Sequence, residues 1–148
     1  MWKRIACLVM VLGTVAGVLI ARRSHAQGSG DLTLTSIVPT FTCGIDGCSG
    51  YFDNYTCNSG TNDPSFSVGS NWTGGGTVSS CTGNWDSTDT ASLVGNQCKY
   101  VRTYGPGYVG PKVSYGANLT VTSYADIYCQ VSESNEANNS KTSLIQVQ

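Results

Sequence analysis

The hydrophobic and polar positions along the chain alternate with a period of two. The clearest run is NLTVTSYADIYCQV, where small and apolar side chains take every second position and polar or aromatic side chains take the others. Such alternation is typical of a strand that buries one face. The run is long, so we expect it to bend or break near Ser123. Its expected inward positions are Leu119, Val121, Ser123, Ala125, Ile127, Cys129 and Val131.

Other segments repeat this pattern. DLTLTSIV, CKYVRTY and the final TSLIQVQ alternate, and in CKYVRTY the side chains of Tyr100 and Tyr104 share the face opposite to Val101. Shorter strand candidates are GYFDNYTC, SFSV, GTVSSC, ASLV and KVSY. Clusters of Gly, Asn, Ser and Pro such as CGIDGCSG separate them and predict turns. No segment has the apolar spacing of a helix longer than a turn or two. The sequence therefore predicts an all-β, antiparallel β-sandwich.

The first 26 residues have a different pattern. A short basic segment precedes an apolar run, Ile5–Ala21, and the small residues Ser24 and Ala26 suit a cleavage site. This pattern is typical of a secretory signal peptide, 1–26, which would leave 27–148 as a single exported domain. The arginine pair that follows the apolar run keeps an uncleaved membrane anchor open as the alternative.

Removal of this leader leaves four basic against nine acidic side chains, a net charge of −5. An acidic domain without clustered Lys and Arg does not suit nucleic acid. It does not suit anionic lipid either. We therefore expect no nucleic-acid partner, and no membrane insertion once the signal is cleaved.

The cysteine content points to an oxidising compartment. An even number in a small exported domain predicts disulfides, whereas zinc would require Cys-x-x-Cys pairs or histidine partners that the domain lacks. Six cysteines allow 15 pairings, and the sequence does not choose among them. We expect at least one bridge to tie the loop-rich middle of the chain to the regular sheet. The disulfide-forming residues are Cys43, Cys48, Cys57, Cys81, Cys98 and Cys129.

The two ends of this domain resemble a CARDB domain, a cell-adhesion-related domain found in bacteria and archaea. The resemblance rests on DLTLTSI near the start and on ADIYCQVSESNEANNS before the last strand, about a quarter of the domain. The middle of the chain departs from the family pattern, and the cysteines are additional. The resemblance implies an immunoglobulin-like sandwich of about seven strands, but such folds have many functions. The matching turn residues are Glu133, Ser134, Asn135, Glu136, Asn138 and Asn139.

This SESNEANNS segment reads first as a structural turn. Asn and Ser side chains bond nearby backbone groups, and we expect Glu133 and Glu136 to stay solvated beside them. Calcium binding is the weaker alternative, because the segment lacks Asp ligands and a glycine at the bend. A second group of oxygen-bearing side chains also lacks the ligand spacing of a calcium-binding loop, and we expect it to be an ordinary loop. We therefore predict no metal site. The members of this second group are Asp53, Asn54, Asn58 and Asp63.

The residues of the predicted domain give little support for a catalytic function. The only histidine, His25, lies in the leader, which excludes Ser-His-Asp and Cys-His sets from the domain. Paired cysteines are not nucleophiles, and TGGG lacks the remainder of a phosphate-binding loop. A carboxylate pair for glycoside hydrolysis is not excluded by spacing alone. We predict no enzymatic activity, no catalytic residues and no cofactor.

Surface features complete the picture. Four Asn-x-Ser/Thr sequons would accept glycans in some cells, at Asn54, Asn71, Asn118 and Asn138. Aromatic side chains on rigid loops suit contact with sugars or proteins, although they can also cover a thin core. These candidate contact residues are Trp72, Trp85, Tyr104 and Tyr108.

We therefore predict a secreted, non-catalytic module for cell-surface adhesion or extracellular assembly, whose partner is a protein or a surface glycan. A self-assembling filament subunit joined by strand exchange is one alternative. A small secreted carbohydrate-binding or inhibitory module is another.

Overall fold

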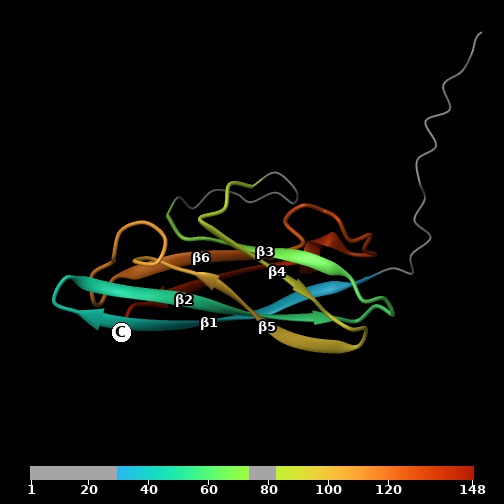
Figure 1. Cartoon of the computed structure of the whole chain (residues 1–148), viewed down its shortest axis with the longest axis horizontal. Helices are drawn as coiled ribbons and strands as arrows, with labels where there is room; N and C mark the ends of the chain where they lie inside the picture. Colours follow the sequence, from blue (N-terminus) through green and yellow to red (C-terminus); the bar gives the residue numbers. More distant parts are fainter. Residues whose placement is uncertain (1–29, 74–82) are drawn as a thin grey trace, which may run out of the picture.

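The computed structural model describes residues 30–73 and 83–148, so the predicted signal peptide, the strand candidate GTVSSC and Cys81 lie outside the described residues. The described chain is all-β, as predicted, with one short 3-10 turn, Glu136–Asn138 (η1). Figure 1 shows an elongated molecule in which long strands run side by side. The strands are Leu32–Gly44 (β1), Gly47–Asn58 (β2), Ser65–Asn71 (β3), Ser87–Ser92 (β4), Gln97–Tyr104 (β5), Asn118–Ala125 (β6) and Ser140–Gln146 (β7).

The seven strands form two antiparallel sheets. The three-stranded sheet has the order β1-β2-β5, and the four-stranded sheet has the order β4-β3-β6-β7. The chain changes sheet after β2, after β4 and again after β5, so strands distant in sequence become neighbours. The two sheets pack their apolar faces together, which confirms the predicted sandwich of about seven strands.

Some strand boundaries differ from the sequence prediction. The segment CGIDGCSG, expected to be a loop, extends β1 and β2 into a long hairpin with only Ile45 and Asp46 at its turn. KVSY contributes one isolated bridge, between Val113 and Cys48, and is not a strand. The glycines near the hairpin tip interrupt the alternation, so the sequence alone does not show that this segment is paired. The pairing depends on the partner strand.

The long alternating run also ends earlier than expected. β6 stops at Ala125, because Asp126 and Cys129 take left-handed conformations, with φ of 57° and 47°. The buried carboxylate of Asp126 holds this turn by accepting hydrogen bonds from Gln130 N (2.9 Å) and Val131 N (2.8 Å). The run therefore breaks two residues after Ser123, close to the predicted position, whereas the placement of Cys129 on the strand was wrong.

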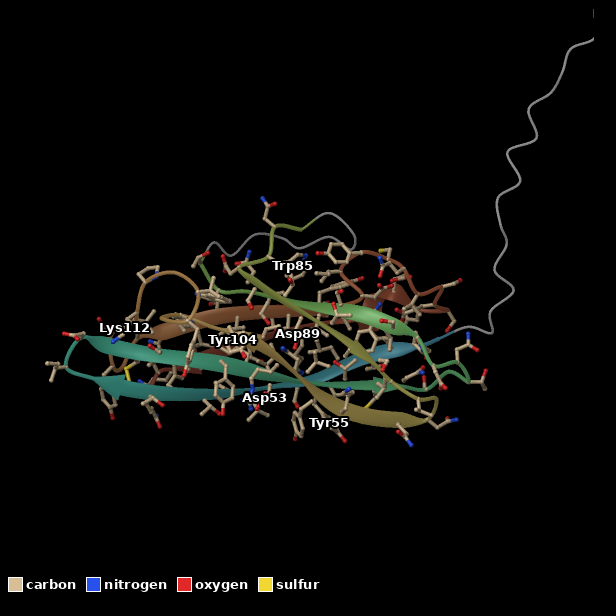
Figure 2. All side chains as sticks on the ribbon, viewed as in Figure 1. Asp53, Tyr55, Trp85, Asp89, Tyr104 and Lys112 are labelled. Carbon is tan, nitrogen blue, oxygen red and sulfur yellow. A yellow bond between two sulfur atoms is a disulfide. The ribbon has the colours of Figure 1, made fainter. Side chains whose placement is uncertain are left out.

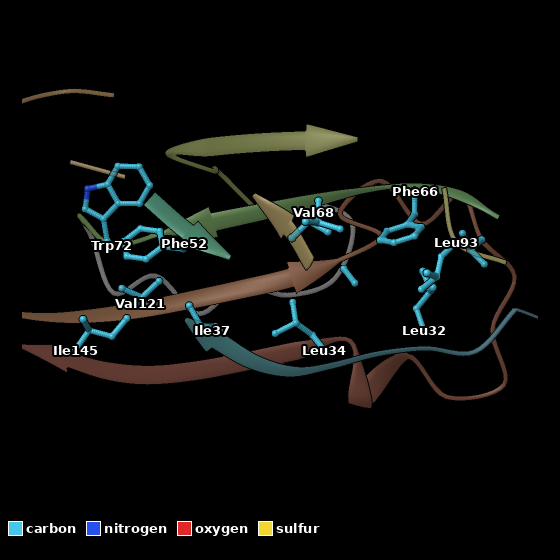
Figure 3. Close-up of a cluster of buried hydrophobic side chains, with 13 residues drawn as sticks. Leu32, Leu34, Ile37, Phe52, Phe66, Val68, Trp72, Leu93, Val121 and Ile145 are labelled. Atoms are coloured by element: carbon cyan, nitrogen blue, oxygen red, sulfur yellow. The ribbon is translucent and has the colours of Figure 1, made fainter. Parts of the chain in front are cut away.

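A continuous hydrophobic core fills the space between the sheets (Figure 3). β1 keeps its apolar side chains inward by means of a bulge. The register slips between Leu34 and Ser36, so Leu34 and Ile37 both face the core although they are three positions apart. Thr35 is the extra residue, and its hydroxyl donates to Tyr55 O (3.1 Å). The core members are Leu32, Leu34, Ile37, Phe52, Phe66, Val68, Trp72, Leu93, Val101, Val121, Ala125, Val131 and Ile145.

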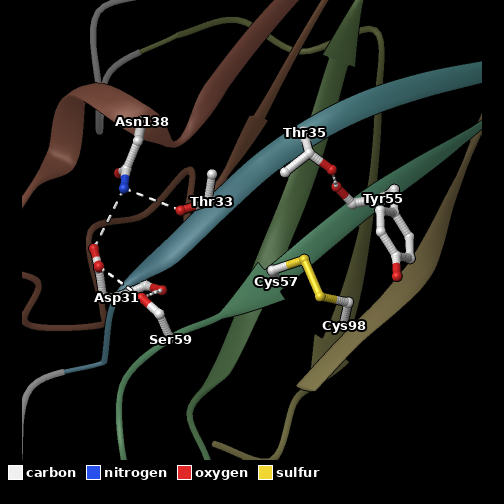
Figure 4. Close-up of a disulfide and its surroundings, with 8 residues drawn as sticks. All are labelled: Asp31, Thr33, Thr35, Tyr55, Cys57, Ser59, Cys98 and Asn138. Carbon is white, nitrogen blue, oxygen red and sulfur yellow. Dashed lines mark hydrogen bonds between the residues drawn. A yellow bond between two sulfur atoms is a disulfide. The ribbon is translucent and has the colours of Figure 1, made fainter. Parts of the chain in front are cut away.

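The cysteines form disulfides, as predicted, and two of the bridges join neighbouring strands. Cys43–Cys48 closes the β1–β2 hairpin near its tip, and Cys57–Cys98 joins β2 to β5 (Figure 4). Cys129 is disulfide-bonded as well. The cysteines of the β2–β5 bridge are 41 positions apart in sequence, whereas those of the hairpin bridge are 5 apart. The β2–β5 bridge therefore restricts the unfolded chain more.

The interior of the three-stranded sheet is unusually polar. The amide of Asn54 is buried and donates to Val101 O (3.1 Å) and to Thr103 Oγ1 (3.0 Å). Thr103 Oγ1 lies 2.6 Å from Ser70 Oγ, which lies 2.7 Å from Ser123 Oγ. This inner polar cluster, formed by Asn54, Thr103, Ser70 and Ser123, connects the two sheets across the core. A glycan on Asn54 does not fit the folded domain, which corrects that sequon prediction.

Candidate functional site

The SESNEANNS segment is a joint between the two sheets. The carboxylate of Glu133 accepts hydrogen bonds from Leu32 N at the start of β1 (2.7 Å) and from Asn139 Nδ2 just before β7 (3.0 Å). Asn139 is fully buried, and its amide also donates to Glu136 Oε2 (3.1 Å). Segments about a hundred residues apart are thereby fixed to one another through a single side chain.

Glu133 is half-buried, so the expectation that it stays solvated was wrong. Burial raises the pKa of Glu133 to about 7, although the hydrogen bonds from Leu32 and Asn139 act in the opposite direction. The negative charges of Glu136 and Asp126 raise it further. Glu136 is exposed, and partial desolvation followed by the charge of Asp126 raises its pKa.

The remaining residues of the segment also have structural contacts. Asn135 Oδ1 accepts from Ala137 N (3.1 Å) and caps η1. The amide of Asn138 lies 3.0 Å from Thr33 Oγ1 on β1 (Figure 4). Ser134 is exposed. Within residues 30–73 and 83–148, no group of three or more acidic, cysteine or histidine side chains is placed to hold a metal ion. The geometry is that of a structural turn.

The two tryptophans predicted as contact residues both pack against other parts of the fold, but to different extents. Trp72 is only 9% exposed and lies in the core, with its ring centroid 5.6 Å from that of Phe52. Trp85 is half-buried over the backbone of Gly69 and contacts the ring of Tyr124. A side chain at Gly69 would collide with the indole, which explains the glycine there. The assignment of Trp72 as a contact residue was therefore wrong, because its ring is buried, whereas that of Trp85 stays a prediction.

The predicted tyrosines, in contrast, belong to a larger exposed surface. Tyr104 and Tyr108 are 51% and 59% exposed, and their ring centroids lie 5.7 Å apart. Tyr104 is the last residue of β5, whereas Tyr108 lies in the loop that follows. Both adjoin the outward side of the three-stranded sheet, which we call the tyrosine face. It comprises Tyr51, Asp53, Tyr55, Tyr100, Arg102, Tyr104 and Tyr108.

The tyrosine face has three cross-strand rows. In the β2–β5 register, Tyr55 is opposite Tyr100, Asp53 is opposite Arg102, and Tyr51 is opposite Tyr104. Alternate residues of a strand point to the same side, so the rows follow one another at about 7 Å. The first row brings two rings to a centroid distance of 4.7 Å. Figure 2 shows Asp53 and Tyr55 at one side of the molecule and Trp85 at the other.

The charges within this face neutralise one another. Arg102 Nε donates to Asp53 Oδ1 (2.8 Å) and Nη2 donates to Asp53 Oδ2 (2.9 Å), a two-pronged ion pair. The guanidinium carbon also lies 3.6 Å from the ring centroid of Tyr51. The hydrogen bond to Asp53 raises the pKa of Arg102. The middle row is therefore charged but carries no net charge.

Backbone hydrogen bonds hold the edge of the tyrosine face in place. Gly50 N donates to Pro106 O (2.9 Å), and Gly105 N donates to Gly50 O (2.8 Å), so the loop after β5 continues to pair with β2. Gly107 has φ of 79°, and a side chain there would meet Ser49. The loop that carries Tyr108 is thus fixed against the sheet.

Sequence reasoning found only part of this face. The alternation in CKYVRTY correctly placed Tyr100 and Tyr104 together, opposite the buried Val101. Tyr51 and Tyr55 were missed as contact residues, although they alternate in the predicted strand GYFDNYTC. The alternation in the sequence shows that Tyr51 and Tyr55 share a face, but it does not show that this strand pairs with CKYVRTY.

The other sequons differ in exposure. Asn118 is exposed at the start of β6, whereas Asn71 is half-buried and its amide donates to Asn84 O (3.0 Å). Asn138 is half-buried in the turn. Of the four, the side chain of Asn118 alone is fully accessible.

No helix among the described residues has the length and apolar character needed to span a membrane. No family model matches the chain, and no curated protein sequence matches it.

Similar solved structures do exist. The CARDB domain of a Pyrococcus furiosus protein, solved in complex with di-metal ions, is 20% identical with a TM-score of 0.55, over 80% of this chain and 94% of that one. A β-glucosidase from Streptomyces venezuelae, solved with D-glucose, is 12% identical with a TM-score of 0.44, over 80% of this chain and 15% of that one. The first likeness concerns the fold alone. At that level it confirms the resemblance in the sequence: this chain has the fold of a CARDB domain.

Proposed function

We propose that this chain is an exported, non-catalytic module that holds an extracellular partner on its tyrosine face. The observation that carries the proposal is the outward side of the three-stranded sheet. The inward side of this sheet already buries an apolar core face that includes Phe52 and Val101, together with the inner polar cluster. The outward side nevertheless presents a group of tyrosine rings to water, and contact with a partner is a physical reason for such a group.

Tyrosine suits such a contact surface. Each ring supplies a large apolar area and loses little conformational freedom on binding, and its hydroxyl replaces hydrogen bonds to water. The ordered rows and the fixed loop reduce the entropy that binding would cost. Cross-strand disulfides support an oxidising, extracellular location. The histidine-free domain and its paired cysteines support a function by contact and not by catalysis.

The proposal is tested by retention of the purified domain on the surface of cells of its own source. We expect fluorescently labelled domain to bind, and the double variant Tyr55→Ser/Tyr100→Ser to lose most of this binding. Tyr115→Ser and Tyr128→Ser are matched controls, since both tyrosines are exposed but lie outside the face. Equal retention of the face variant and the controls would refute the proposal.

Self-assembly is a second candidate, and the edge strand β7 favours it. Among the described residues, β7 pairs with β6 alone, and its outward Leu144 is 75% exposed. An unpaired edge accepts a strand from a neighbouring copy. Gel filtration and negative-stain microscopy over increasing concentration test this idea. Filaments that disappear with Leu144→Lys would support it, and a monomer at the highest concentration would oppose it.

A further inference from the structure

The tyrosine face has a chemistry that points to one class of ligand. We propose that it binds an uncharged polysaccharide, laid along β2 and β5 so that successive sugar units meet successive rows. The inference rests on the proposed contact function and names its ligand class. It is argued from the order of the rows, their charge balance and the cost of covering the central ion pair.

The order of the rows matches the two-sided chemistry of a sugar. A sugar ring has C–H faces that pack on aromatic rings and hydroxyl groups that need hydrogen-bond partners. The face offers rings at Tyr55 and Tyr100, then hydrogen-bonding groups at Asp53 and Arg102. The third row again offers an exposed ring, that of Tyr104, because the guanidinium of Arg102 lies over the ring of Tyr51. The two aromatic rows are about 13 Å apart, so a chain of several sugar units would reach both.

Charge complementarity favours a neutral ligand. The carboxylate of Asp53 is matched by the guanidinium of Arg102, and no other acidic or basic side chain belongs to the three rows. A polyanion would meet the acidic surface of the exported domain without a cationic patch to hold it. An uncharged chain meets no such barrier.

The exposed ion pair argues against a protein or a second copy as occupant. The side chains of Arg102 and Asp53 retain 46% and 21% exposure, and an apolar partner surface would strip water from both. That desolvation is costly unless new hydrogen bonds replace the lost ones. Sugar hydroxyls donate to the carboxylate and accept from the guanidinium, so they replace the water directly.

The test is affinity electrophoresis of the intact domain through native gels that contain one polysaccharide each. The probes are a neutral β-glucan, mannan and xylan, with dextran sulfate as the charged comparison. We expect at least one neutral polymer to retard the domain, without dependence on salt, and dextran sulfate to have no effect. Calorimetry with a hexasaccharide and a disaccharide of the retarding polymer should show tighter binding of the longer ligand, because only it spans both aromatic rows.

Variants connect this binding to the face. Tyr100→Ala/Tyr104→Ala should weaken binding about tenfold or more, whereas Tyr100→Phe should retain it because the ring remains. Tyr115→Ala and Tyr128→Ala are the matched controls and should bind as the parent does. Thermal unfolding of each variant confirms that the loss is not a loss of fold.

Several outcomes would overturn the inference. These are no retardation by any neutral polymer, full binding by Tyr100→Ala/Tyr104→Ala, salt-sensitive binding to dextran sulfate only, or self-association that the same variant abolishes. If the polysaccharides fail while cell-surface retention still depends on Tyr55 and Tyr100, the ligand assignment fails and the contact function stands. If retention is also indifferent to those residues, both fail.

Discussion

The two sheets of this sandwich have similar inward sides and different outward sides. Inward, each sheet combines apolar side chains, such as Phe66 in one and Phe52 in the other, with members of the inner polar cluster. Outward, the four-stranded sheet presents the Thr122–Thr142 pair, with its 2.9 Å hydrogen bond, and Leu144, whereas the three-stranded sheet presents rows of tyrosines. Burial of apolar surface explains the inward sides. The outward sides show that period two fixes which residues share a face, but not which chemistry faces water.

The inward and outward sides of β2 should differ most in stability. Phe52→Ala removes a fully buried ring that packs against Phe41 and Trp72, and should cost about 3–5 kcal/mol of unfolding free energy. Tyr51→Ala, its neighbour on the opposite side, should cost below about 1 kcal/mol. Urea unfolding followed by tryptophan fluorescence measures both. Similar losses of unfolding free energy in Phe52→Ala and Tyr51→Ala would contradict the difference in burial between the two sides of β2.

The inner polar cluster should contribute less than the ring but more than any outward residue. Asn54→Ala leaves Val101 O and the hydroxyl of Thr103 without this donor, and should cost about 1–3 kcal/mol. Asn118→Ala, at an exposed sequon, is the control and should leave the unfolding midpoint nearly unchanged. A stabilising Asn54→Ala would indicate that the cluster serves specificity and not stability.

The joint between the sheets should make stability depend on pH. Glu133 has a folded-state pKa of about 7 against an ordinary value of 4.5, so the native state binds the proton more tightly than the unfolded chain does. Stability is therefore greatest below about pH 4.5 and decreases as pH rises to about 7, by about 1–3 kcal/mol after allowance for partial exposure.

Glu133→Gln is the matched variant, because the amide keeps an acceptor for Leu32 N without an ionisable group. Its unfolding free energy between pH 4.5 and 8 should vary less than that of the parent in the same buffers. An identical pH dependence in both proteins would show that the joint is not the titrating group.

The smallest effect should come from the tyrosine face. Tyr100→Ser loses one cross-strand ring contact, with Tyr55, and should cost about 0.5–1 kcal/mol. The same variant should strongly reduce cell-surface retention, because a residue that serves contact with a partner should affect binding far more than stability. Thermal unfolding and the retention assay on the same preparation measure the two effects together. A loss of unfolding free energy as large as that of Phe52→Ala would show that Tyr100 contributes to stability as a core residue does, and would contradict this prediction.

Local pattern predicted much of the fold and less of the site. The alternation of β6 and β7 and the shared face of Tyr100 and Tyr104 were predicted from the sequence, as were the CARDB-like ends of the chain. The break of the long run near Ser123 was also predicted, but not its cause, which is that the Asp126 carboxylate accepts hydrogen bonds from Gln130 N and Val131 N. Glu133 was predicted to be solvated, because nothing near it in sequence indicates that Leu32 N will lie 2.7 Å away.

The sequence by itself determined that this chain forms strands joined by disulfides, since side-chain periodicity and cysteine content can be recognised without knowledge of the tertiary structure. Only the tertiary structure decided that Tyr51 and Tyr55 meet Tyr100 and Tyr104, and that Trp72 is buried while Tyr108 is not. The physical reason is that strand pairing brings together residues some fifty positions apart. A residue's alternation gives its side of a strand, but its neighbours and its exposure depend on which strand pairs with it.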